Sequence, residues 1–245
     1  MELKIIHFYP DLMSLYGSYA NVSVLRRYLE GLGNSVTVET VVPGQEADLS
    51  QADFIFMGAG TERSQKAALA DFVRFGGAVK AAAESGVTML FAGTAMELLG
   101  KSITDADGRI YDGIGLAGFA SVQGRKRFVE DVCGKTDLYP DAVVGFMNKC
   151  TIVKAVETPL LTAVSLGYGN EGTGGAEGFH WKNVFASQLT GPILVKNPRL
   201  LEAVAAAIYQ HRGETLPEDR PVDRWAEDGY AITAEQLALR CESKN

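Results

Sequence analysis

One stretch of this sequence has the order of residue types that nucleophilic chemistry requires. Residues 87–92 form an apolar run, Gly93 and Thr94 make a turn, and residues 95–99 continue with helical character. This order is typical of a nucleophile elbow, in which one side chain stands on a strained turn while the following backbone N–H groups stabilise an oxyanion. The tip of this turn is Gly93, which has no side chain. Glycine also serves purely structural strand-to-helix turns because it accepts positive φ, so other segments must decide between the two interpretations.

A second glycine turn follows the apolar run at residues 52–57. Gly58, Ala59 and Gly60 lead into a helical segment for which Thr61 is the expected N-cap. Because the carboxyl ends of parallel strands meet at one edge of a sheet, where ligands bind, we expect this turn to lie beside Gly93. The turn lacks the Lys-Ser/Thr pair of a phosphate-binding loop.

The elements that must position these turns alternate between strands and helices. A strand is predicted at residues 3–8, a helix from Val22 to Leu32 closed by Gly33, and a further strand at residues 36–42. Another helix, at residues 77–84, precedes the elbow strand. This alternation predicts a three-layer α/β fold around a mostly parallel sheet.

The second half of the chain is expected to be rich in strands. Glycine turns separate short β-prone runs at residues 128–132, 142–146, 160–164 and 184–189. A core helix begins at Asn197-Pro198, and a polar connector leads to a short last helix beginning at Thr233, with Gln236 at capping-box spacing. We therefore predict one domain over residues 1–212, followed by a connector and C-terminal helix over residues 213–245.

Composition excludes several classes of partner. The net charge of −7 argues against nucleic acid, because a phosphate-reading surface needs clustered Lys and Arg. No run of about 18 apolar residues predicts a membrane span, and the sequence starts directly in a strand pattern without an apolar signal region. The three cysteines, Cys133, Cys150 and Cys241, are too widely spaced for a metal knuckle, and their odd number favours a reducing compartment over a disulfide framework. We expect a cytoplasmic protein without membrane insertion, metal or cofactor.

Several segments together resemble the class I glutamine amidotransferases of the cobyric acid synthase type, in particular the glutaminase subunits of bacterial lipid II isoglutaminyl synthases. The resemblance covers residues 3–212 and implies a flavodoxin-like three-layer fold. It rests on short motifs that occur in one order: His7-Phe8 with Asp11, Leu15-Tyr16 and Asn21; residues 58–65 (G-A-G-T-E-R-S-Q, resembling G-G-G-S-D-R-E-Q); residues 93–100 (G-T-A-M-E-L-L-G, resembling C-G-G-Y-Q-x-L-G); residues 144–148 (V-G-F-M-N); residues 167–170 (G-Y-G-N); residues 177–183 (E-G-F-H-W-K-N); and residues 189–194 (L-T-G-P-I-L).

The resemblance implies a catalytic cysteine and histidine that this chain lacks. The cysteine position falls on Gly93 and the histidine position on Thr190. Two pocket positions differ as well, since the family's glutamate falls on Met147 and a histidine falls on Lys149. A thiolate attacks an amide only when a neighbouring base takes its proton, so we expect glutamine hydrolysis to be absent or very weak.

The resemblance also marks residues that could still bind a ligand. Arg127 matches an arginine implicated in the glutaminase function of the family, although a solvated surface charge is an equal alternative. Cys150 is the candidate for a substitute thiol, against the alternative of a small apolar filler, and His180 is expected to be structural. The expected substrate pocket comprises Gly58, Ala59, Gly60, Arg63, Thr94, Met147, Asn148 and Lys149.

Three functions remain open from the sequence. The first is an amidotransferase-like subunit that has lost glutamine hydrolysis and acts as partner or regulator of a Mur-ligase-like synthetase in cell-wall or related amide chemistry. The second is a working amidotransferase with rearranged catalytic groups. The third is a stand-alone protein whose altered pocket holds a small amino-acid-like ligand.

Overall fold

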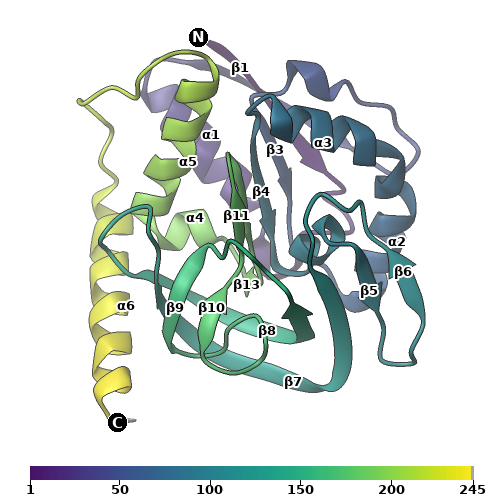
Figure 1. Cartoon of the computed structure of the whole chain (residues 1–245). Coiled ribbons are helices and arrows are strands. Elements are labelled where there is room, and N and C mark those ends of the chain that lie inside the picture. The colour runs from purple at the N-terminus through teal and green to yellow at the C-terminus, as the bar shows by residue number, and fades with distance from the viewer. Residues whose placement is uncertain (244–245) are drawn as a thin grey trace.

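A six-stranded sheet forms the middle layer of the fold (Figure 1), in a computed structural model that describes residues 1–243. Its strand order is β11-β12-β4-β3-β1-β2. All neighbours pair in parallel except β11, which is antiparallel to β12. The strands are β1 (Glu2–Phe8), β2 (Ser35–Val41), β3 (Phe54–Met57), β4 (Thr88–Ala92), β11 (Phe179–Trp181) and β12 (Val184–Ser187).

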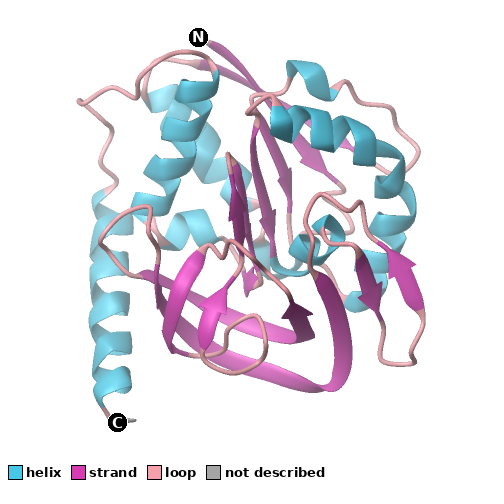
Figure 2. Ribbon diagram, viewed as in Figure 1, coloured by secondary structure: helices cyan, strands magenta, loops and turns pink. Residues whose placement is uncertain are grey.

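Helices cover both faces of this sheet, as Figure 2 shows. In β3, Ile55 and Met57 face the core under α2 (Glu62–Phe72) and α3 (Gly76–Glu84), whereas Phe54 and Phe56 face the core under α1 (Ala20–Gly31) and α5 (Pro198–His211). Every residue of β3 and of β4 is buried, as expected for a parallel sheet with helices on both faces. The predicted three-layer α/β fold is confirmed.

A second sheet packs beside the first and accounts for the strand-rich half. Its two longest strands, β7 (Ala120–Lys135) and β8 (Val143–Lys154), pair in antiparallel register. Both strands are longer than the β-prone runs predicted at residues 128–132 and 142–146, because polar residues interrupt the apolar pattern on which the prediction relied. The remaining strands are β5 (Ser102–Thr104), β6 (Ile110–Asp112), β9 (Leu161–Leu166), β10 (Gly175–Glu177) and β13 (Leu189–Thr190).

Short helices complete the connections. They are η1 (Leu15–Gly17), η2 (Leu49–Gln51), η3 (Val73–Phe75), η4 (Gly93–Leu99) and α4 (Ile193–Lys196). The segment after the elbow, η4, is a 3₁₀ helix rather than a regular α-helix. Thr61 caps α2 as predicted, accepting a hydrogen bond from the N–H of Ser64.

The C-terminal helix begins earlier than predicted. α6 (Arg224–Glu242) is capped by Asp223, whose carboxylate accepts hydrogen bonds from the N–H groups of Trp225 and Ala226. Thr233 lies inside this helix and its hydroxyl donates to the carbonyl of Gly229, so the predicted start at Thr233 is wrong. One face of α6 packs on the second sheet through Leu237, which is buried with Cys133, Val144 and Leu166.

Candidate functional site

The turn at the end of β4 has the backbone of a nucleophile elbow. Gly93 directly follows the buried strand and has a φ of +63°. This value lies in the left-handed region, which residues other than glycine rarely adopt. The predicted meeting of the two glycine turns is confirmed, since the N–H of Gly60 donates to the hydroxyl of Thr94. The fold therefore builds the place for a nucleophile and leaves it without a reactive group.

The space that a nucleophilic side chain would need is filled by Ala59. A Cβ atom placed on Gly93 would lie 2.6 Å from the Cβ of Ala59 and 3.2 Å from its Cα. Carbon atoms in contact prefer separations of about 3.5–4.0 Å, so any side chain at position 93 must displace the neighbouring loop. The sequence signal for this contact was Ala59 itself, which stands in a turn that is all glycine in the resembled family.

The hydroxyl of Thr94 forms hydrogen bonds with the backbone of Gly60 in the neighbouring turn. Its hydroxyl accepts from the N–H of Gly60 at 2.9 Å and donates to the carbonyl of Gly60 at 3.0 Å. The side-chain amide of Gln65 donates to the carbonyl of Thr94 at 2.7 Å. An oxyanion hole requires free N–H groups aimed at the developing charge, and the N–H of Gly60 is already taken.

The predicted base position, Thr190, lies at the same edge of the central sheet. β12 pairs with β4 so that Ser187 is opposite Ala92, and the chain reaches Thr190 three residues later. The Thr190 hydroxyl donates to the carbonyl of Phe146 at 3.1 Å. A hydroxyl committed to a backbone carbonyl does not act as a general base near neutral pH.

Lys149 replaces a pocket group with a buried structural cation. Its ammonium donates to the carbonyls of Gly169 at 2.7 Å and Asn170 at 3.2 Å, and to the side-chain oxygen of Gln188 at 2.5 Å. Burial lowers the pKa of Lys149 to about 8, against the attraction of Glu177. Three acceptors match the three protons of an ammonium group, so Lys149 ties the segment around residue 170 to the chain before β13. The neighbouring pocket position, Met147, is a fully buried apolar side chain.

Asn148 and Arg127 remain polar and lie at the surface. Arg127 donates from Nε to the Asn148 side-chain oxygen at 2.8 Å and forms an ion pair with Glu62 at 3.0 Å. Asn148 donates in turn to the hydroxyl of Tyr16 at 2.8 Å. These contacts bring together four segments that are far apart in the sequence, and they place Arg127 beside the predicted pocket.

Cys150 lacks the surroundings of an activated thiol. Its sulfur lies 3.2 Å from a carboxylate oxygen of Glu62. Burial, followed by this hydrogen bond and the charge of Glu62, raises the pKa of Cys150 to about 11, so only about one thiol in ten thousand is ionised at pH 7. Within residues 1–243 no histidine hydrogen-bonds to Cys150, and His180 instead packs against Phe185 with ring centres 4.8 Å apart.

Sequence reasoning missed a buried polar network behind the elbow. Glu97, at the position of the family's glutamine, is 1% exposed, and its carboxylate accepts from the side-chain amide of Gln123 at 3.1 Å. Gln123 also donates to Gln65 at 2.8 Å, and Lys66 donates to Gln123. Burial raises the pKa of Glu97. The change from glutamine to glutamate at residue 97 was the available signal.

Residues 1–243 offer neither a metal site nor a membrane-spanning helix. No group of three His, Cys, Asp or Glu side chains is placed to hold a metal ion. No helix in this part of the chain is long and apolar enough to cross a membrane.

Comparison with known proteins agrees with the geometry. Residues 4–198 match the CobB/CobQ-like glutamine amidotransferase domain. The chain is similar to the lipid II isoglutaminyl synthase (glutamine-hydrolyzing) subunit GatD of Staphylococcus aureus, with 28% identity over 97% of this chain and 95% of that protein. It is also similar to the GatD subunit of Streptococcus pneumoniae, with 30% identity over 88% of this chain and 84% of that protein.

A solved structure supports the fold alone. The structure of PurLQS from Thermotoga maritima matches with a TM-score of 0.53 and 12% identity, over 86% of this chain and 97% of that chain.

Proposed function

Because the chain belongs to the family of CobB/CobQ-like glutamine amidotransferases, we propose that it is a GatD-like subunit that no longer hydrolyses glutamine and acts as partner or regulator of a Mur-ligase-like synthetase. The observation that carries this proposal is the contact between Gly93 and Ala59, which leaves no room for a nucleophile at the elbow. The commitment of Thr94 and Thr190 to backbone groups supports it. In serine proteases, removal of the nucleophile and its base leaves a rate enhancement of only roughly 10³–10⁴ over the uncatalysed reaction in water. An enhancement of this size is too small for a useful supply of ammonia.

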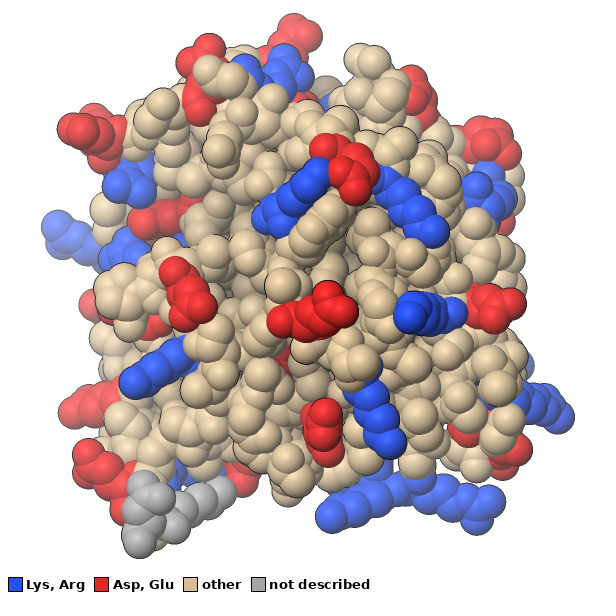
Figure 3. Space-filling view, in the orientation of Figure 1, with Lys and Arg blue, Asp and Glu red and all other residues tan. Residues whose placement is uncertain are grey.

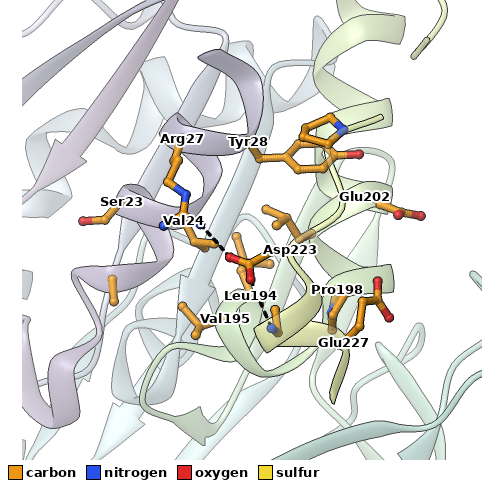
Figure 4. Close-up of a pocket in the computed structure, with 14 residues that line it drawn as sticks. Ser23, Val24, Arg27, Tyr28, Leu194, Val195, Pro198, Glu202, Asp223 and Glu227 are labelled. Carbon is orange, nitrogen blue, oxygen red and sulfur yellow. Dashed lines mark hydrogen bonds and ion pairs between the residues drawn. The ribbon is translucent and has the colours of Figure 1, made fainter. Parts of the chain in front are cut away.

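Exposed apolar side chains beside the candidate site and near a neighbouring groove support the role of a partner. Beside the candidate site, Leu15, Tyr16 and Tyr19 are 39%, 44% and 56% exposed. Tyr19 directly precedes α1, and α1, α4, α5 and the connector enclose a groove of about 320 Å³ (Figure 4). The ion pair of Arg27 with Asp223, at 2.6 Å, closes one side of this groove.

Val222 and Trp225 do not line the groove but directly adjoin the lining residues Asp223 and Ala226 in the chain, and they are 70% and 87% exposed. Large exposed apolar side chains gathered around a groove are typical of a protein interaction site. Of the apolar residues on α6, Leu237 is buried on the second sheet, while Ile232 and Leu239 stay exposed. We propose that the surface from Tyr16 to Trp225 docks on the synthetase.

The first experiment measures ammonia release from glutamine by the purified chain. We expect a turnover far below the value of about 1 s⁻¹ that marks an ordinary enzyme, and the same low rate in Cys150→Ser. A turnover of about 1 s⁻¹ or more would overturn the loss of hydrolysis. Its disappearance in Cys150→Ser would then assign the reaction to that thiol.

The second experiment tests the partner. The chain is co-expressed with a Mur-ligase-like synthetase from the same genome, and the pair is analysed by size-exclusion chromatography at micromolar concentration. We expect a complex that buries on the order of 1,200–2,000 Å², and a ligase whose rate with free ammonia changes when this chain is present. Separate elution together with unchanged ligase kinetics would favour the stand-alone binding protein instead.

Surface variants assign the docking face. We expect Trp225→Ser and Tyr19→Ser each to weaken the complex at least tenfold, because buried aromatic residues dominate interfaces. Ile110→Ser is the matched control, since Ile110 is 70% exposed on β6, outside this surface. Equal effects of all three variants would refute the assignment.

A further inference from the structure

A cleft of about 510 Å³ adjoins the candidate site between α2, the loop joining β5 to β6, and β7, and its lining includes Arg63 of the expected pocket as well as Arg127 and Cys150. Neither Gly93 nor Thr190 lines it. Its charged lining comprises the cations Arg63, Lys66, Arg125 and Arg127 and the carboxylates Glu62, Asp105 and Asp107. In a chain of net charge −7, a concave site with more cations than carboxylates is a local exception.

An irregularity in β7 brings two of these cations to the cleft. Gln123 pairs with Thr151 and Phe128 pairs with Lys149, so four residues of β7 stand opposite one residue of β8. Such bulges re-aim side chains beside functional sites. Arg125 and Arg127 line the cleft, whereas Lys126 extends over the ring of Phe128, 5.4 Å from its centre. In Figure 3, Lys and Arg side chains project from the lower edge of the molecule, where β7 bends.

Most of the lining charges already have partners. Arg127 is paired with Glu62, and Lys66 donates to the side chains of Gln65 and Gln123. The carboxylate of Asp105 accepts from the N–H groups of Asp107 and Arg109 and from the hydroxyl of Tyr111.

Two guanidinium groups are left over. The side chains of Arg63 and Arg125 form no hydrogen bond or ion pair with any residue in the described range, 1–243, although both line the cleft. The Asp107 carboxylate is likewise without a partner in that range, and it belongs to the hairpin loop on the other wall. An incoming anion would therefore be attracted to the arginine side of the cleft.

We propose that this cleft binds a small anion whose carboxylate or phosphate group is held between Arg63 and Arg125. The planar guanidinium presents paired donors that match both kinds of oxyanion. Lys66 adds a further positive charge to the lining, and its partial desolvation strengthens its attraction for an anion. This inference goes beyond the proposed partner role and does not depend on it.

The test is calorimetric titration of the full chain at constant ionic strength, with inorganic phosphate in one arm and glutarate in the other. We expect one of the two anions to bind with a dissociation constant of about 1 mM or below, and the arm that binds identifies the oxyanion class. Arg63→Gln and Arg125→Gln should each weaken binding about tenfold, as expected for a lost charge-assisted contact.

Lys126→Gln is the matched control, because it removes one positive charge from the same bulge without touching the cleft lining. It should weaken binding less than twofold. All three side chains are exposed or partly exposed, so the variants should fold, and circular dichroism checks this. Absence of binding by both anions at 10 mM would overturn the proposal. So would an effect of Lys126→Gln equal to that of Arg125→Gln, or no effect of Arg63→Gln.

Discussion

The contact between Gly93 and Ala59 predicts that these two positions are energetically coupled. A Cβ at residue 93 would lie 2.6 Å from the Cβ of Ala59, and overpacking of this kind costs about 1–3 kcal/mol. The φ of +63° adds about 1–2 kcal/mol for any residue with a side chain. Gly93→Ala should therefore lower the free energy of unfolding by about 2–5 kcal/mol.

Ala59→Gly should relieve the steric part of that cost and leave the backbone part. In the Ala59→Gly background we expect Gly93→Ala to cost only about 1–2 kcal/mol, because the missing methyl group removes the clash. The double-mutant cycle should then give a coupling energy of about 1–3 kcal/mol. Gly93→Cys places the same Cβ at this position and should show the same coupling.

The coupling energy is measured by urea unfolding, followed by circular dichroism, of the wild type, the two single variants and the double variant. It is obtained from the unfolding midpoints, provided that the dependence of the free energy of unfolding on urea concentration is the same in all four. Gly118→Ala is the matched control, since a Cβ there meets no atom within 4 Å and its φ lies outside the positive region. We expect that control to change stability by less than about 0.5 kcal/mol. If Gly93→Ala costs the same in the wild-type chain and in the Ala59→Gly background, the elbow is not packed shut and the central argument for lost hydrolysis fails.

Three further predictions concern buried polar groups. Burial lowers the pKa of His7 from 6.5 to about 4, so the stability it contributes is complete above pH 6.5 and is lost as the pH falls towards 4. Relative to His7→Leu, the wild-type free energy of unfolding should decrease by about 2 kcal/mol between pH 7 and pH 5 in urea titrations, and parallel curves would refute this. The pKa of Lys149 is lowered from 10.5 to about 8, so between pH 8 and pH 9.5 the folded chain loses this proton while the unfolded chain still holds it. Relative to Lys149→Met, the wild-type free energy of unfolding should therefore rise by about 1–2 kcal/mol over that range. A decrease would contradict the assignment. Thr94→Val should cost about 2 kcal/mol in the same assay, because it leaves the N–H and carbonyl of Gly60 without a partner, and a neutral effect would show that these groups find other partners.

The parts of the fold that were predictable are those fixed by local pattern. The first strands, the helix closed by Gly33 and the cap at Thr61 follow from apolar periodicity and from residues with special backbone preferences. The helix start at residue 224 was missed because the first turns of α6 bury no side chain and Trp225 is 87% exposed. Its capping residue, Asp223, was a visible signal, but the prediction followed the capping-box spacing of Thr233 and Gln236 instead.

The candidate site shows the same division. The two glycine turns were placed together correctly because parallel strands end at one edge of a sheet. The clash at Ala59, the three acceptors around Lys149 and the bulge that presents Arg125 depend on the register between segments distant in sequence. No pattern within one segment encodes that register.

The contacts at the elbow also predict that changing single residues to the family's catalytic types will not produce glutamine hydrolysis. A thiol at Gly93 would meet Ala59, a histidine at Thr190 would break its hydrogen bond to Phe146, and Lys149 is anchored by three acceptors. Ala59, which differs from the family pattern, blocks position 93, and the side chains of Thr190 and Lys149 are hydrogen-bonded to backbone carbonyls. A joint Gly93→Cys and Thr190→His variant should therefore stay inactive in the ammonia assay, because the thiol still lacks space and Met147 and Lys149 still lack the pocket chemistry. The proposed docking surface from Tyr16 to Trp225 does not depend on these positions, which is why we propose a function in docking rather than in hydrolysis at the elbow.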